Sequence, residues 1–168
     1  MHNERYSILY SSATGNTRLL ADTIRAALPP ELCDAFGAVG ETAAESELLY
    51  VGFWTDKGNA DADTLALLQT QKNKRLFLFG TAGFGVDTAY FDAILARVQA
   101  VPDGSNTVIG TYMCQGKMPP SVRARYEAMR ALPVPPENLD ALIENFDRAR
   151  SHPDADDLDR LRAAVLHA

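Results

Sequence analysis

The chain has 168 residues, of which 46% are apolar and 23% are charged, and its formal net charge at neutral pH is −6. This is the length of one ordinary domain, with enough apolar residues for a hydrophobic core. The acidic balance disfavours nucleic acid as a partner, because phosphate backbones attract basic surfaces. With no apolar run of membrane-spanning length and no signal peptide pattern, we expect a soluble, cytoplasmic protein.

Apolar runs alternate with helical patterns along the chain. Five runs predict buried strands, over residues 6–10, 32–36, 48–54, 76–79 and 108–113. The spacing of apolar residues predicts helices over residues 18–28, 61–71, 90–98, 122–132, 139–146 and 158–165. Right-handed crossovers would wind this order into an open, doubly wound parallel sheet with helices on both faces.

The pattern breaks at Ser151-His152-Pro153, before the last predicted helix. We therefore predict one main domain over residues 1–150 and a C-terminal helical extension, residues 151–168, packed on it. The segment from Glu137 to the end contains eight acidic residues and four arginines, which gives it a net charge of −4. Solvated helix faces explain this charge, and a docking surface for a basic partner is the alternative.

Neither cysteine nor histidine residues show the spacing of a disulfide framework or a metal site. Cys33 and Cys114 lie far apart in apolar surroundings, which is typical of buried thiols in a reducing compartment. His2, His152 and His167 lie in terminal or inter-helix segments, so we expect solvated histidines and no metal.

The segment Ser11–Thr17 (SSATGNT) follows the first predicted strand and precedes a helix. Its hydroxyls, its backbone N–H groups and the helix dipole can converge on one anion. A nucleoside triphosphate or dinucleotide loop is unlikely, because neither G-x-x-x-x-G-K-[ST] nor G-x-G-x-x-G occurs. We predict a phosphate monoester site without a neutralising cation, formed by Ser12, Ala13, Thr14, Gly15, Asn16 and Thr17.

Further polar loops follow the other strands and should open on the same edge of the sheet, where ligands of such folds bind. The loop after the third strand supplies candidate residues Trp54, Thr55, Asp56, Lys57 and Gly58. The loop after the fourth supplies Thr81, Ala82, Gly83, Phe84 and Gly85. Trp54 either closes the core or forms a wall for a flat ligand, and the glycines allow close approach of a ligand or simply form a turn.

After the fifth strand, Gln115 and Lys117 follow in a loop whose lysine could equally be solvated. Together these loops describe a site for a phosphorylated flat heterocycle.

The chain resembles the flavodoxin family. Ser12, Thr14, Gly15, Asn16 and Thr17 match the family's phosphate loop, S/T-x-T-G-N-T, and the resemblance covers about residues 5–150. Within the family, the chain is most similar to short flavodoxins of anaerobes, including those associated with bilirubin reductase. The resemblance implies a five-stranded sheet in the order 2-1-3-4-5, and FMN with its ring between the loops after strands three and four.

The resemblance further implies an electron carrier that needs no catalytic residue and passes electrons to a redox partner, such as a reductase, docked on the FMN edge. A peptide flip at Lys57-Gly58 or Thr55-Asp56 would offer a carbonyl to the flavin N5–H. The stacking tyrosine of many flavodoxins is replaced by Thr88 or Ala89, so Phe84 would have to supply that ring or leave one flavin face open.

Two other functions stay open. An open flavin face would favour an FMN-dependent NAD(P)H oxidoreductase acting on a quinone, a flavin or a tetrapyrrole-like substrate. A flavin-free regulatory module that binds only phosphate is the other alternative.

Overall fold

The computed structural model describes residues 3–85 and 87–168, and within them a parallel sheet forms the centre of the molecule. Its strands are β1 (Tyr6–Tyr10), β2 (Cys33–Ala38), β3 (Leu48–Asp56), β5 (Arg75–Ala82) and β6 (Thr107–Gln115). They lie in the order β2-β1-β3-β5-β6, and each neighbouring pair is parallel. This order is the predicted 2-1-3-4-5, with a short additional strand, β4 (Asn59–Ala60), paired antiparallel with β3.

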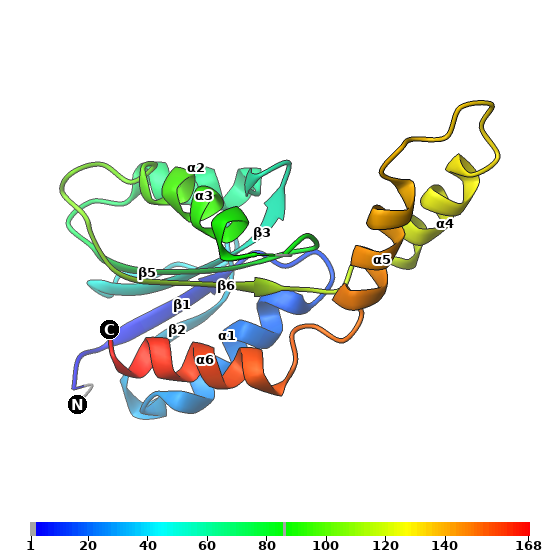
Figure 1. Ribbon diagram of the computed structural model, residues 1–168. Coiled ribbons are helices and arrows are strands. Elements are labelled where there is room, and N and C mark those ends of the chain that lie inside the picture. The colour runs from blue at the N-terminus through cyan, green and yellow to red at the C-terminus, as the bar shows by residue number, and fades with distance from the viewer. Residues whose placement is uncertain (1–2, 86) are drawn as a thin grey trace.

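Helices cover both faces of this sheet (Figure 1). One face carries α2 (Ala62–Thr70) and α3 (Thr88–Gln99), and the other carries α1 (Asn16–Ala27) and α6 (Ala155–Leu166). A single 3-10 turn, Pro30–Leu32, precedes β2. Two more helices, α4 (Pro120–Met129) and α5 (Leu139–Ala149), project beyond the end of β6 as a helical hairpin. None of the helices in the described ranges could cross a membrane.

The central strands are continuously apolar because both of their faces are buried. Leu49, Val51 and Phe53 of β3 pack in one cluster with residues of α2 and α3. The alternate residues Leu48 and Tyr50 pack in a second cluster with residues of α1 and α6. A strand with side chains alternating between two cores needs apolar residues at every position, which is the pattern that predicted it.

Helix α6, which lies in the predicted C-terminal extension, packs in the main core. Leu161 and Val165 are fully buried in the same cluster as Leu20 and Ile24 of α1. The part that stands apart is the helical hairpin, residues 120–149, whose buried side chains form their own small cluster of Tyr126, Leu139, Ile143 and Phe146. The predicted boundary at residue 150 follows chain order, whereas the core brings together helices far apart in sequence.

β3, β5 and β6 are longer than predicted, and this changes the place of several candidate residues. β3 continues to Asp56, and Lys57 and Gly58 then form a tight turn to β4 with φ angles of 51° and 81°. Two successive left-handed residues match the twist of a two-residue hairpin. Similarly, Thr81 and Ala82 belong to β5 and not to a loop.

Candidate functional site

The predicted phosphate loop lies at the carboxyl end of β1 and leads directly into α1. Gly15 stands at the helix N-cap with φ of +88°, a conformation that favours glycine, while a Cβ there would meet no atom within 4 Å. Ser12 Oγ accepts hydrogen bonds from the backbone N–H groups of Gly15 (3.1 Å) and Arg18 (3.3 Å). The hydroxyl of Ser12 therefore holds the loop in shape.

The start of α1 is open to an anion. Ala13, Thr14 and Gly15 are exposed, and no acidic residue lies in the first helical turn. Within the described part of the chain, the backbone N–H groups of Asn16 and Thr17 donate to no protein acceptor. Unpaired N–H groups at the positive end of a helix attract phosphate, so this donor set fits a phosphate monoester.

Two side chains of the loop, Asn16 and Thr17, form hydrogen bonds within the protein. Thr17 is 1% exposed, and its Oγ1 donates to the carbonyl of Phe53 at 3.0 Å and lies 3.2 Å from Thr81 Oγ1. The Asn16 amide donates to the carbonyl of Lys117 at 2.8 Å. These contacts join the loop to β3, to β5 and to the segment after β6, which leaves Thr14 as the exposed hydroxyl of the loop.

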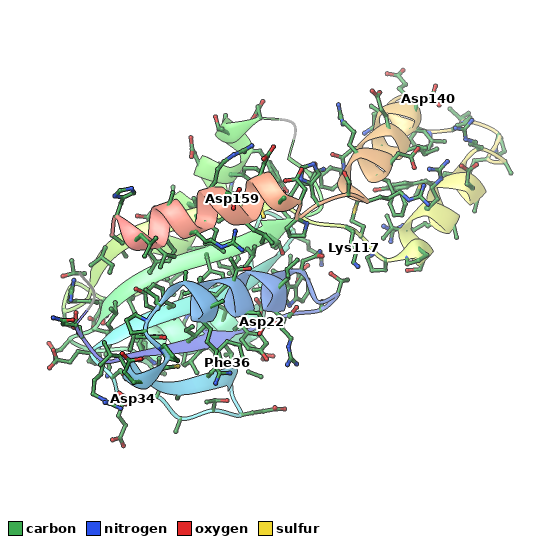
Figure 2. All side chains as sticks on the ribbon, turned by 90° about the horizontal axis from the view of Figure 1, so that it is seen from below. Asp22, Asp34, Phe36, Lys117, Asp140 and Asp159 are labelled. Carbon is green, nitrogen blue, oxygen red and sulfur yellow. The ribbon has the colours of Figure 1, made fainter. Side chains whose placement is uncertain are left out.

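A cleft of about 220 Å³, here called the loop cleft, opens beside the start of α1. It is lined by Thr14, Gly15, Asn16, Leu19, Lys117, Arg150, Ser151, His152 and Pro153. Lys117 was predicted at this edge of the sheet, but the phosphate site was predicted without a cation. Arg150 was not foreseen here, because it lies more than 100 residues from the loop in sequence. Figure 2 shows Lys117 where the sheet meets the helical hairpin.

A larger cleft of about 720 Å³, here called the hairpin cleft, lies between the loop and the helical hairpin. It is lined by Thr14, Lys117, Met118, Pro119, Pro120, Arg123, Phe146, Asp147 and Arg150. The two clefts share Thr14, Lys117 and Arg150. Trp54 and Phe84 line neither of them, so both clefts belong to the phosphate side of the sheet edge.

The fold agrees with comparisons to known proteins. A family model described as a flavodoxin domain matches residues 7–166. The chain belongs to the flavodoxin family. It is 39% identical over 171 residues to the flavodoxin-like domain-containing protein BilS of Clostridium symbiosum, an alignment that covers 92% of this chain and 90% of that relative.

Solved structures show the same fold at low sequence identity. Oxidised flavodoxin 2 from Bacillus cereus is 14% identical, with a TM-score of 0.58 over 96% of this chain and 95% of that one. A flavoprotein from Lactobacillus acidophilus, solved in complex with FMN, is 16% identical, with a TM-score of 0.51 over 66% of this chain and 93% of that one.

The aromatic candidates of this flavodoxin lie at the same edge of the sheet. Trp54 is half-buried within β3 and pairs with Thr81 of β5. Phe84 is 40% exposed and meets Tyr90 edge-to-face, with 6.4 Å between ring centroids. An exposed phenylalanine between two glycines is available to a flat ligand, whereas Thr88 and Ala89, in the first turn of α3, have no ring to offer.

Neighbouring side chains fill the space beside both glycines that flank Phe84. A Cβ at Gly83 would lie 2.6 Å from Met118 Cγ, and one at Gly85 would lie 2.6 Å from Phe91 Cζ. A side chain at either position would therefore require the Met118 or the Phe91 side chain to move. The loop after β5 therefore packs tightly against the segment after β6 and against α3; Val86, which is part of this loop, lies outside the described residues.

A buried polar cluster, which sequence reasoning missed, ties the hairpin to this loop. Gln115 Nε2 donates to the carbonyl of Gly83 (2.9 Å) and to Asn145 Oδ1 (3.1 Å), and Asn145 Nδ2 donates to the same carbonyl (3.0 Å). Gln115 is 9% exposed and Asn145 4%. An isolated asparagine in an amphipathic helix carries no sequence signal of such a role, because polar residues there are usually solvated.

His152 is not the solvated histidine that its position predicts. It is half-buried, and its Nδ1 lies 2.6 Å from Oδ2 of the buried Asp157. Asp154 and Asp157 form a reciprocal capping box at the start of α6, each accepting from the other's backbone N–H at 2.9 Å. The backbone N–H of Asp157 lowers the pKa of Asp154, so the carboxylate form is favoured. These three side chains lie close enough to share a cation, but their mutual contacts already have a structural role.

Cys114 is buried, as predicted, and burial raises the pKa of its thiol. Cys33 is half-buried.

Proposed function

We propose that this flavodoxin binds FMN through the Ser12–Thr17 loop and works as an electron carrier. The open start of α1, with the unpaired N–H groups of Asn16 and Thr17 beside the exposed Thr14, is the observation that carries this proposal. Membership of the flavodoxin family supports it, as does the FMN complex of the similarly folded Lactobacillus flavoprotein.

The residues of the chain divide into two groups toward this cofactor. The backbone of Ala13–Thr17 and the Thr14 hydroxyl would hold the phosphate, while Lys117 and Arg150 add positive charge beside it. The exposed ring of Phe84 and the half-buried Trp54 would confine the flavin ring. When bound, FMN supplies the redox chemistry, and the protein supplies binding, orientation and electrostatics.

The Lys57-Gly58 turn between β3 and β4 would border the flavin ring. Of the two peptides that the family resemblance suggests for a flip, Lys57-Gly58 is the better candidate, because Thr55 and Asp56 are paired with β4. The turn is also fixed from the other side, since Gly58 O accepts a hydrogen bond from Arg97 at 2.6 Å. A flip would therefore be confined to the two turn residues.

A redox partner protein, such as a reductase, would dock on the edge where Phe84 and Lys57 are exposed. Docking there would bring its redox group close to the flavin ring. The NAD(P)H oxidoreductase alternative predicts instead that the isolated protein turns over a small acceptor by itself.

The experiment is a titration of the flavin-free protein with FMN, followed by the fluorescence of both the flavin and Trp54, the only tryptophan of the chain. We expect the fluorescence to be quenched when one equivalent of FMN has been added. The bound flavin should then be reducible, but the protein should not sustain NADH oxidation. Absence of quenching would contradict the proposal and favour the flavin-free module. Sustained NADH oxidation above the rate with free FMN would replace the carrier by the oxidoreductase.

A further inference from the structure

The hairpin cleft continues from the phosphate loop in a direction away from the ring site. Thr14, Lys117 and Arg150 line both it and the loop cleft, whereas Trp54 and Phe84 line neither. A ligand with its first phosphate at the start of α1 could therefore extend past Lys117 and Arg150 into the hairpin cleft. FMN ends at its phosphate, so it leaves this space unexplained.

The hairpin cleft is positively charged although the protein as a whole is acidic. Lys117, Arg123 and Arg150 line it together with a single carboxylate, Asp147. Arg123 pairs with Asp147 and also contacts Glu127 (3.4 Å), and Arg150 Nη1 lies 3.7 Å from Asp147. The lining thus carries more positive than negative charge, whereas the net charge of the chain is −6. Such a lining suits a second phosphate group beside the first.

The rest of the lining is apolar. Met118, Pro119, Pro120 and Phe146 form the wall on the hairpin side, and the Arg123 guanidinium lies 6.0 Å from the centre of the Phe146 ring. A cleft of about 720 Å³ that combines apolar walls with a few charged groups is typical of sites for small organic ligands. A nucleoside joined to the second phosphate would find both kinds of contact here.

We propose that the hairpin cleft binds the adenylate half of FAD, so that this protein accepts FAD as well as FMN. The inference rests on the proposed function, because the FMN half must occupy the phosphate loop. The second phosphate would lie by Lys117 and Arg150, and the adenosine would lie between Arg123 and the apolar wall. The helical hairpin is then a nucleotide-binding attachment to the sheet.

The test compares the dissociation constants of FMN and FAD for the flavin-free protein, measured by fluorescence quenching. The variant is Arg123→Gln, since Arg123 lines only the hairpin cleft, and the control is Arg125→Gln, an exposed arginine on the same helix. We expect wild-type protein to bind FAD more tightly than FMN. Arg123→Gln should weaken FAD binding about tenfold, as for loss of a contact to a charged group, and leave FMN unchanged.

Arg123→Gln also removes the ion pair with Asp147 and could loosen the helical hairpin, so a second variant controls for this effect. This variant is Lys117→Gln, at a residue that precedes α4, and it should weaken the binding of FAD more than the binding of FMN. The helical signal in circular dichroism should stay unchanged in all variants. Equal FAD affinity in wild type, Arg123→Gln and Arg125→Gln, or failure of FAD to bind while FMN binds, would overturn the inference and leave the proposed function standing. If neither flavin binds, the proposed function fails with it.

Discussion

The sheet and the helical hairpin of this flavodoxin are held in place by different forces. The sheet is stabilised by large side chains with almost no exposure, such as Tyr50, Phe77 and Phe79, that connect strands and helices from the whole chain. The hairpin buries only a small cluster of its own and exposes apolar residues at its tip, where Val134 is 85% exposed. Burial of apolar area thus fixes the sheet far more strongly than the hairpin.

What fixes the hairpin relative to the sheet is polar. Gln115 and Asn145 share the carbonyl of Gly83, and Lys117 accepts from Asn16 where the chain leaves β6. Hydrogen bonds depend on direction and are costly when broken in a buried place, so a few of them can set the position of an element with little apolar contact. The clefts on the phosphate side depend on this position.

The largest effect should come from the core of the sheet. Phe79→Ala removes a fully buried ring and should lower the free energy of unfolding by about 3–5 kcal/mol, because it leaves a cavity between strand and helix. Phe146→Ala in the hairpin cluster should act locally. Urea unfolding together with amide hydrogen exchange separates the two: the hairpin amides should lose protection in Phe146→Ala while the strand amides keep theirs. Equal loss of protection in both regions would mean that hairpin and sheet unfold as one unit.

The polar connection between the two regions is the next test. Asn145→Ala should lower the free energy of unfolding by about 1–3 kcal/mol, because Gln115 and the carbonyl of Gly83 each lose a buried hydrogen-bond partner. Faster amide exchange in α5 is the expected signature. Asn138→Ala is the matched control, since Asn138 is exposed at the start of the same helix and caps it with no side-chain hydrogen bond. If both variants behave alike, the polar cluster does not position the hairpin.

The phosphate loop lies between the two regions, and its two threonines should separate stability from binding. Thr17→Val removes the buried donor to Phe53 and should lower the free energy of unfolding by about 1–3 kcal/mol. Thr14→Ala changes an exposed side chain and should leave stability unchanged but cost about 1.5–3 kcal/mol of FMN binding. Thermal unfolding and FMN titration of both variants check this. A stable Thr17→Val protein with weak FMN binding would show that its hydroxyl serves the ligand.

The smallest effect belongs to the junction where the hairpin returns to the sheet at α6. Asp154 has a lowered pKa in the folded protein, so its carboxylate stabilises the fold above the unfolded pKa of about 3.9. This contribution is lost as the pH falls through the lowered folded value. At pH 7 the Asp154→Ala protein should therefore have a lower melting temperature than wild type. This difference in melting temperature should become smaller in acid. A difference that is constant from pH 7 to pH 2 would exclude this carboxylate as its source.

Most of the fold could be predicted from the sequence, because its signals are local. Runs such as Leu76–Phe79 identify buried strands without reference to any partner, and the strand order follows from the resemblance of the loop around Gly15 to the flavodoxin loop. The same loop predicts the phosphate site, since donors, glycine and helix start are neighbours in sequence. Strand β4 was missed because it is only two residues long.

The sequence by itself thus determined the layers of this protein and predicted the place where a phosphate would bind. Only the tertiary structure decided where side chains point and which distant residues meet: Thr17 turns inward to Phe53, α6 joins the core, and Arg150 reaches the loop. The physical reason is that burial depends on the character of a local run, whereas hydrogen bonds and clefts depend on the relative positions of elements far apart in sequence.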